Sequence, residues 1–334
     1  MKNKKLLIWM ITSFFCCMCL NLYASDSVIY SGSTKDREDL KSFIFIGDTQ
    51  RASNWEIGRE KNDEVRPLIL KQIAAENPAF IVHLGDFVFM GSDEDEWNAF
   101  DNFALNIRKK SIPVFPTLGN HEYFGNNEKA FKNYFSRFPH INNAKWYSFK
   151  FCNIGFIILN SNFDELKEKE QAKQNDWYLK KLEDLQNDSS ITSIIIACHH
   201  SPYTNSTIVS ADEDVQKYFV EPMFDIPKAK LFFTGHCHSY EHFEKNGKHF
   251  IVTGGGSGPR QKLRTKPIYQ DTFEGERIRN FHYCKVTIKD EGLLVQMIYI
   301  DDNILRQAQD DNKQAQDDNK WKVGQEFLVG YEKD

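Results

Sequence analysis

The sequence has little cysteine after its first 24 residues, no strong excess of charge of one sign and only one long hydrophobic run. Three of its seven cysteines fall at Cys16, Cys17 and Cys19, inside that run. The remaining four lie in strand-like segments and do not form the framework of a small disulfide-rich domain, so we expect buried thiols. The formal net charge of -5 gives no sign of a basic nucleic-acid surface.

The single hydrophobic run lies at the N-terminus. Three lysines within the first five residues precede an apolar stretch from Leu6 to Leu22. The stretch is shorter than the ~20 residues of a membrane-spanning helix, and Leu22-Tyr23-Ala24 resembles a cleavage site. We therefore expect residues 1–24 to be a removed signal peptide, leaving no stable membrane span and a secreted or periplasmic protein. A retained N-terminal anchor is the alternative interpretation.

Short, continuously apolar segments alternate with segments of helical spacing. Apolar residues spaced as on a helix face occur in 65–73, 97–107 and 177–185. Apolar segments of strand length are typical of strands buried on both faces. These segments are 43–46, 80–84, 113–117, 154–159, 193–198 and 231–234. The alternation predicts an α/β fold.

The C-terminal third has a different pattern. Segments 282–288 and 293–300 alternate in polarity around a turn, which predicts a hairpin in a second, more antiparallel sheet. The glycines of 254–258 lack a following Lys-Ser/Thr and are not a P-loop, so they are interpreted as a turn. We expect a signal peptide at 1–24, a lead-in at 25–40, one domain at 41–301 and, at 302–334, a polar tail with a short tandem repeat.

Polar residues able to bind metals follow five of the predicted strands. In α/β sheets the crevice beyond the strand C-termini binds ligands, so these side chains are expected to converge. A mixed set of carboxylate, amide and imidazole suits zinc, manganese or iron, and it is too large for one tetrahedral ion. The residues are Asp48, Asp86, the run Asn120-His121-Glu122, the pair His199-His200, and His236 with His238.

In sequence order these motifs resemble those of the calcineurin-like metallophosphoesterases. Gly-Asp, Gly-Asp, Gly-Asn-His-Glu, His-Ser-Pro and Gly-His-x-His follow one another between Asp48 and His238. The segments around His200 and His236 look most like the purple acid phosphatase branch. The resemblance implies a four-layer α/β/β/α sandwich of two mixed β-sheets flanked by helices.

The resemblance also implies a role for each motif residue. Asp48 and His238 would hold the first metal ion, Asp86 would bridge, and Asn120, His200 and His236 would hold the second. His121 would be the acid near the leaving group, with Glu122 orienting its ring. Arg51 and Tyr203 lie near the motifs and are candidates for substrate contact or for packing at the rim.

Two positions depart from the family pattern. Many relatives have a histidine two residues after the first aspartate, where this chain has Gln50. Gln50 donates its amide oxygen or leaves the position to water, so the first metal ion is expected to bind less tightly. Purple members have a tyrosine three residues after the bridging aspartate, whose phenolate binds ferric iron. Phe89 stands here and cannot ligate, which implies a colourless enzyme.

Neighbouring residues are given structural interpretations. Strand alternation places His199 on the face opposite to His200. His83 lies within an apolar strand and is expected to be a hydrogen-bonded core residue. Cys237 is expected to point away from the metals. His242 is interpreted either as a substrate contact or as a surface residue.

The predicted reaction is hydrolysis of a phosphate monoester. Two metal ions of iron, zinc or manganese would generate hydroxide from water for attack on phosphorus, while His121 protonates the leaving alkoxide. The small-molecule substrate is alternatively a phosphodiester or a nucleotide. A secreted, non-catalytic binding protein on a decayed hydrolase scaffold is the alternative from a different class.

Overall fold

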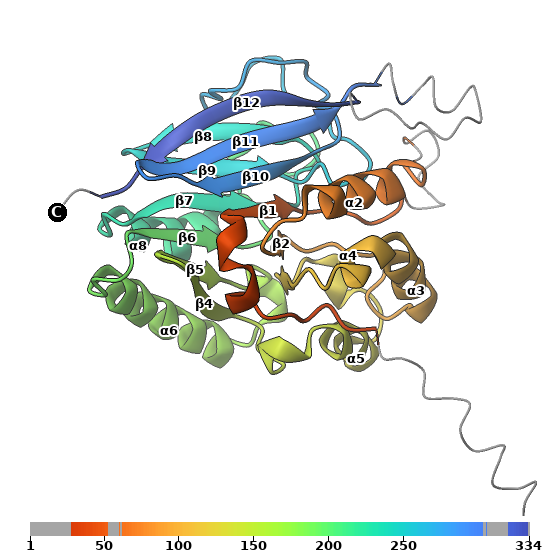
Figure 1. Ribbon diagram of the computed structural model, residues 1–334, viewed down its shortest axis with the longest axis horizontal. Coiled ribbons are helices and arrows are strands. Elements are labelled where there is room, and N and C mark those ends of the chain that lie inside the picture. Colours follow the sequence, from red (N-terminus) through yellow and green to blue (C-terminus); the bar gives the residue numbers. More distant parts are fainter. Residues whose placement is uncertain (1–27, 53–59, 61, 303–304, 306–319, 333–334) are drawn as a thin grey trace, which may run out of the picture.

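The chain folds into two packed sheets with helices on both outer faces (Figure 1). The computed structural model describes residues 28–52, 60, 62–302, 305 and 320–332, so the expected signal peptide and the tandem repeat lie outside the described residues, except for Lys320. Within the described ranges, no helix has the length and apolar character needed to cross a membrane.

The first sheet has the strand order β12-β11-β10-β1-β2-β3. Strands β1, β2 and β3 are parallel, whereas β10, β11 and β12 pair in antiparallel fashion. The strands are β1 (Ser42–Ile46), β2 (Ile81–His83), β3 (Val114–Pro116), β10 (His282–Ile288), β11 (Gly292–Ile300) and β12 (Trp321–Gly330). The parallel strands bring three carboxyl ends to one edge of this sheet.

The second sheet has the strand order β4-β5-β6-β7-β9-β8. Strands β5, β6, β7 and β9 are parallel, and β4 and β8 pair antiparallel to their neighbours. The strands are β4 (Tyr147–Phe151), β5 (Ile154–Ile158), β6 (Ser193–Ala197), β7 (Ala229–Thr234), β8 (Tyr240–Lys245) and β9 (Lys248–Thr253).

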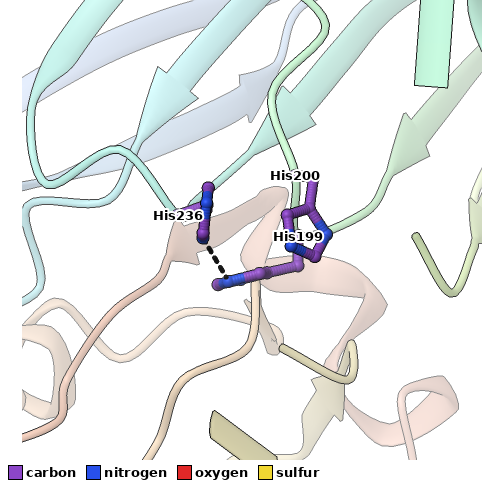
Figure 2. Close-up of side chains that lie close together, drawn as sticks. All are labelled: His199, His200 and His236. Atoms are coloured by element: carbon purple, nitrogen blue, oxygen red, sulfur yellow. Dashed lines mark hydrogen bonds between the residues drawn. The ribbon is translucent and has the colours of Figure 1, made fainter. Parts of the chain in front are cut away.

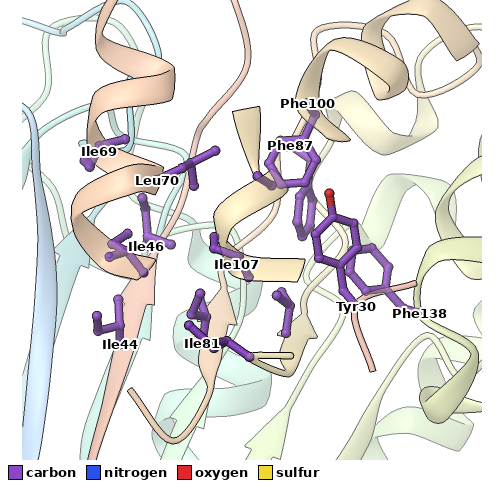
Figure 3. Packing of buried hydrophobic residues seen from close by; sticks show 14 of the residues in the cluster. Tyr30, Ile44, Ile46, Ile69, Leu70, Ile81, Phe87, Phe100, Ile107 and Phe138 are labelled. Carbon is purple, nitrogen blue, oxygen red and sulfur yellow. The ribbon is translucent and has the colours of Figure 1, made fainter. Parts of the chain in front are cut away.

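Alternation along β1 shows how the strands serve two cores at once. Phe43 and Phe45 belong to the core between the sheets, where the ring of Phe45 stacks on Phe233 at a centroid distance of 3.8 Å. Ile44 and Ile46 point to the other face, where helices cover the sheet (Figure 3). Each such buried side chain contributes about 1.5–3 kcal/mol relative to an exposed one.

Helices form the two outer layers. The first sheet is covered by helices whose buried residues share one core with β1 to β3, and the second by helices that pack on β5 to β7. The former are α2 (Val65–Glu76), α3 (Glu94–Phe103), α4 (Leu105–Lys109) and α5 (Asn127–Arg137); the latter are α6 (Glu168–Gln186), α7 (Glu213–Val215), the π-helix η5 (Gln216–Val220) and α8 (Glu221–Phe224). Short 3-10 turns are η1 (Lys35–Leu40), η2 (His121–Tyr123), η3 (Pro139–Ile141) and η4 (Phe163–Glu165). The predicted α/β/β/α sandwich is confirmed.

Three details of the organisation differ from expectation. The β10–β11 hairpin joins β1 in the first sheet, because β10 pairs antiparallel with it, and does not start a second sheet. The region expected to be a tail contains β12, which pairs with β11 along its length. In the expected lead-in, Tyr30 is buried and its hydroxyl donates to Asp101 Oδ1 at 2.8 Å. Tyr30 and β12 therefore both pack with the domain expected at 41–301.

Candidate metal centre

The polar strand ends of both sheets meet at one place. Asp48, Asp86 and Asn120 follow β1, β2 and β3 of the first sheet, while the histidines of 199–200 and 236–238 follow β6 and β7 of the second. Contacts between these groups, described below, show that the two sheets contribute jointly to one site. The carboxylates of Asp48 and Asp86 are almost completely buried.

The backbone at this place is strained. Asp48, Asp86 and His236 adopt left-handed conformations with φ of 62°, 56° and 64°. A non-glycine residue in this region costs of order 1–3 kcal/mol, and such residues cluster at functional sites. Hydrogen bonds hold the turns, because Asp48 N donates to Gly85 O and His236 N donates to the Asp48 carboxylate at 3.0 Å.

Two glycines let the backbone approach the carboxylates. A Cβ atom on Gly119 would stand 2.2 Å from Asp86 Oδ1, and one on Gly235 would stand 2.5 Å from Asp48 Oδ2. Both distances are far below van der Waals contact. The glycines of these motifs are therefore required by the close packing of strand ends around Asp48 and Asp86.

Asp48, Asp86 and His238 form a first cluster, with one donor atom from each within 4.8 Å of the others. His238 Nε2 lies 3.3 Å from Asp48 Oδ1, and its Nδ1 lies 2.8 Å from the carbonyl of Pro259. The carbonyl accepts the Nδ1 proton, so Nε2 presents its lone pair to the cluster.

Gln50 also reaches this first cluster. Its Nε2 lies 3.1 Å from His238 Nε2 and 3.3 Å from Asp86 Oδ2. Its Oε1 is buried and has no hydrogen-bond partner among the residues described. Because the two ends of an amide are exchanged by a half-turn of the side chain, Gln50 is able to present oxygen to the same point.

His199, His200 and His236 form a second cluster (Figure 2), which Asn120 joins through contacts of its Oδ1 with His199 and His236. His236 Nδ1 lies 3.1 Å from Asn120 Oδ1 and 3.2 Å from His199 Nε2. His199 Nε2 lies 3.0 Å from Asn120 Oδ1 and 3.4 Å from Asp86 Oδ2. The Ser161 hydroxyl is 2.9 Å from His200 Nδ1 and leaves its Nε2 for the cluster.

The expectation that His199 points away from the site is wrong. Strand alternation requires extended backbone, and β6 ends at Ala197, two residues earlier. Beyond that point the chain turns, and both His199 and His200 face His236. The carbonyl of Leu84 lies 2.7 Å from His199 Nδ1, which fixes Nε2 toward Asp86.

The charges within the site are balanced by imidazole. Burial alone would lower the pKa of His199, but the carboxylates of Asp86 and Asp48 outweigh it and raise the pKa to about 9. Burial also raises the pKa of Asp86, yet His199 and His121 hold it well below its usual value. By contrast, burial and the neighbouring His199 lower the pKa of His200 to about 3. Among the described residues no lysine or arginine pairs with Asp48 or Asp86.

The spacing of the donors fits metal ions. Neighbouring donors of the second cluster are 3.0–3.4 Å apart, close to the ~3.3 Å between ligands of a tetrahedral ion bound at 2.0–2.1 Å. Asp86 Oδ2 contacts both Gln50 and His199, so this carboxylate stands between the two clusters. Among the described residues only imidazoles pair with these two buried carboxylates, and cations that displaced the imidazole protons would supply the positive charge that the carboxylates require.

Glu122 has a different task from the one expected. Its carboxylate accepts backbone N–H groups of Asp86, Phe87 and Gly119 at 2.8–2.9 Å. It therefore ties two strand ends together and does not orient the ring of His121. That ring is instead held by the carbonyl of Phe89, 2.6 Å from His121 Nδ1. Burial, followed by the charge of Asp86, raises the pKa of Glu122 to about 8.

His121 stands beside the clusters. Its Nε2 is 3.8 Å from Asp86 Oδ2, and its ring lies between Phe89 and the half-exposed Phe124 at centroid distances of 5.1 and 4.4 Å. Arg51 lies over Phe89 and pairs with Glu96 at 2.6 Å, which places it near this side of the site.

Tyr203 is not brought to the site. It is buried in the core beneath the second sheet and packs against Phe243, Phe250 and Tyr269. Its interpretation as a candidate substrate contact is wrong, and the structure agrees with the alternative that Tyr203 packs against other residues.

Other predictions near the motifs have clear outcomes. His83 is buried, stacks on Phe87 and contacts the Thr49 hydroxyl at 3.1 Å, which confirms its place in the core. Cys237 is buried in the core outside both clusters. His242 is buried, so it is not a surface residue, and it groups with Glu244 and His249 rather than with either cluster of the metal centre. The four cysteines Cys152, Cys198, Cys237 and Cys284 are free thiols.

One residue of the site was missed by sequence reasoning. Ser161 supports His200 through its hydroxyl and follows β5, the one of the six predicted apolar strands for whose C-terminal end no ligand was predicted. Asn160 and Ser161 follow this strand as the metal-binding residues follow the other five, but neither residue type is a typical metal ligand.

With the site defined, comparison with known proteins gives its class. The family model for calcineurin-like phosphoesterase matches residues 41–240, more than half of the chain, and the protein belongs to this family. Purple acid phosphatase 1 of Ipomoea batatas is 24% identical over 208 residues, covering 57% of this chain and 42% of that relative. Purple acid phosphatase 22 of Arabidopsis thaliana is 25% identical over 171 residues, covering 48% and 38%. The chain thus spans less than half the length of these relatives.

Solved structures show the same fold. GAP50, the anchor in the inner membrane complex of Plasmodium, has a TM-score of 0.63 at 18% identity and covers 87% of this chain and 89% of its own. Purple acid phosphatase PPD1 of Lupinus luteus has a TM-score of 0.60 at 18% identity, and the match covers 77% of this chain and 51% of that one. A dimetal phosphatase of Danio rerio has a TM-score of 0.57 at 14% identity, and the match covers 88% of this chain and 99% of that one. The family and the clustered donors support a phosphatase-like metal site.

Proposed function

We propose that this chain is an exported enzyme that hydrolyses a phosphate monoester with two metal ions, in the manner of an acid phosphatase. The observation that carries the proposal is the convergence of buried carboxylate, amide and imidazole donors from five strand ends into two adjoining clusters. The N-terminal run of the sequence supports export, as a signal peptide of residues 1–24.

The donors divide naturally between two ions. Asp48, His238 and the amide oxygen of Gln50 are proposed for the first, and Asn120, His200 and His236 for the second. Asp86 is proposed as the bridge, since its Oδ2 contacts residues of both clusters. His199 is proposed as a further donor to the second ion, because its Nε2 stands at ligand spacing from three of the other donors.

The residues around the clusters suit phosphoryl transfer to water. Two cations of zinc, manganese or iron held by these donors would lower the pKa of bound water and offset the charge of the phosphate oxygens. With its Nδ1 proton donated to the Phe89 carbonyl, His121 is able to hold a second proton at Nε2 and pass it to the leaving alkoxide. Arg51, near the same side, is proposed to attract the phosphate.

A second candidate is a non-catalytic binding protein on this scaffold. It is favoured by the departures at Gln50 and Phe89 and by the fold shared with GAP50, which is described as an anchor. The full set of donors for the second ion and the bridge argues for catalysis. Phosphodiesters and nucleotides remain alternative substrates, since the clusters do not distinguish them.

The experiment is a phosphatase assay on the processed protein after reconstitution with zinc, manganese or iron, using a monoester, a diester and a nucleotide. We expect metal-dependent monoester hydrolysis that chelation abolishes. The Asp86→Asn variant should lose this activity, while His140→Ala, on the η3 turn, should keep it. A folded wild type that takes up metal but cleaves none of the substrates would refute the enzyme and favour the binding protein.

A further inference from the structure

A second group of metal-competent side chains lies on the β8–β9 hairpin. His242 and Glu244 belong to β8, and His249 belongs to β9. One donor atom from each lies within 4.8 Å of the other two. His242 Nε2 is 3.0 Å from His249 Nδ1, and His249 Nδ1 is 3.7 Å from Glu244 Oε1.

The hairpin fixes these three residues on one face. Glu244 pairs directly with His249, and His242 precedes Glu244 by two residues, so all three side chains leave the same side. The turn contains Asn246 and Gly247 with φ of 53° and 71°, typical of a two-residue type I′ turn that sets the register. The donors are therefore placed by regular structure.

The surroundings keep the imidazoles neutral and in place. Burial, with the neighbouring His249, lowers the pKa of His242 to about 4, and burial also lowers the pKa of His249. Phe327 of β12 stacks on both rings at centroid distances of 4.1 and 5.3 Å. At neutral pH both rings therefore have a nitrogen lone pair for a cation.

The nearby positive charges do not occupy this place. Lys245 lies over the ring of Tyr203, and Lys248 donates to the carbonyls of Ile226 and Ala229. Lys230 on β7 pairs with Glu332 at 2.9 Å, which offsets its charge. Glu244 is half exposed and is able to move toward the histidines.

We propose that His242, Glu244 and His249 form a separate site for one zinc ion, which links the two strands of the β8–β9 hairpin. Two imidazoles and one carboxylate are a common ligand set for zinc, with water in the fourth position. The site is distinct from the centre described above, because His249 precedes Thr253 by four residues, about 13 Å of strand, and the Thr253 carbonyl bonds to Gly47 beside Asp48.

The test is a count of bound zinc by elemental analysis of the processed protein after zinc loading and desalting. We expect His249→Ala to hold one zinc ion fewer than the wild type and to keep its phosphatase activity. The matched control His140→Ala, outside both groups of donors, should hold as much zinc as the wild type. Equal zinc in His249→Ala and the wild type would overturn the proposal.

A second variant keeps the test decisive if His249→Ala does not fold. Glu244→Gln changes a half-exposed side chain and should weaken this zinc site more than about tenfold in calorimetric titration, without loss of fold. Unchanged affinities would overturn the site. If the dinuclear centre did not bind metal, the wild type and every variant would each hold two zinc ions fewer than proposed. The difference of one ion between the wild type and His249→Ala would remain.

Discussion

Replacing His121 by alanine is expected to slow hydrolysis of alkyl phosphates much more than that of nitrophenyl phosphate. The ring is held at Nδ1 by the Phe89 carbonyl, and its Nε2 lies 3.8 Å from Asp86 Oδ2, beside the proposed metal ions but outside their donors. A general acid at this position matters most when the leaving group is a strongly basic alkoxide. Nitrophenolate leaves without a proton.

The size of the effect follows from the access of water to the site. General acids contribute about 10²–10⁴-fold to rate. The side chain of His121 is 16% exposed, so water is able to enter the space left by alanine and replace part of its function. We therefore expect a loss of about 10²–10³-fold in kcat for an alkyl monoester, equal to about 3–4 kcal/mol in the barrier.

The assay compares kcat for glycerol phosphate and nitrophenyl phosphate in the wild type, His121→Ala and His140→Ala. Metal content is measured in each, since loss of His121 should leave it unchanged. His140→Ala should match the wild type on both substrates, because His140 lies on the η3 turn among Phe115 and Phe138. Equal losses on both substrates in His121→Ala, with full metal content, would refute the role of His121 as acid.

Four further predictions concern the same centre. Metal affinity should fall about tenfold per pH unit below about pH 9, because His199 must lose a proton before its nitrogen binds an ion. Burial lowers the pKa of His199, but Asp86 outweighs burial and raises this pKa to about 9. A flat affinity profile in calorimetry between about pH 6 and pH 9 would contradict this prediction. Gly119→Ala should abolish metal uptake, since its Cβ would stand 2.2 Å from Asp86 Oδ1, whereas the control Gly330→Ala, whose Cβ has no neighbour closer than 3.8 Å, should bind metal normally. The iron-loaded protein should lack a purple absorption band, because Phe89 has no phenolate, and such a band in the visible spectrum would count against the proposed donor set. Phe124→Ala should raise KM for aryl phosphates about threefold to tenfold and leave alkyl phosphates nearly unchanged, since the half-exposed ring lies 4.4 Å from His121; equal shifts for both substrates would exclude a contact with the leaving group.

Much of the fold was predictable because its central strands are buried on both faces. The segments at β1, β2, β3, β5, β6 and β7 are continuously apolar, and each lies within a residue or two of its predicted position. The strands that were missed are β4, β8, β9 and β12, of which all but β9 lie at a sheet edge. β12 has alternating half-exposed residues and follows a polar repeat, so its pairing with β11 is visible only in three dimensions.

The motif residues of the site were predictable because they follow buried parallel strands, and the parallel strands of one sheet end at one edge. Two details depended on local backbone that sequence does not reveal. His199 turns into the site because the chain leaves β6 at Ala197, and Glu122 turns toward the N–H groups of Asp86 and Phe87 because η2 begins directly after Asn120. Tyr203, three residues from His200, lies in the core because the following loop runs under the sheet.

The residue at position 89 also bears on the charge of the proposed metal ions. The carboxylates of Asp48 and Asp86 offset about half the charge of two divalent cations, and the amide and imidazole donors add none. The excess positive charge would then attract a phosphate dianion. A phenolate at position 89 would supply a third anionic donor, which suits a trivalent ion, whereas Phe89 supplies none. Because a trivalent ion without that donor would leave still more uncompensated charge beside the buried carboxylates, we expect a pair of divalent ions here, such as zinc or manganese.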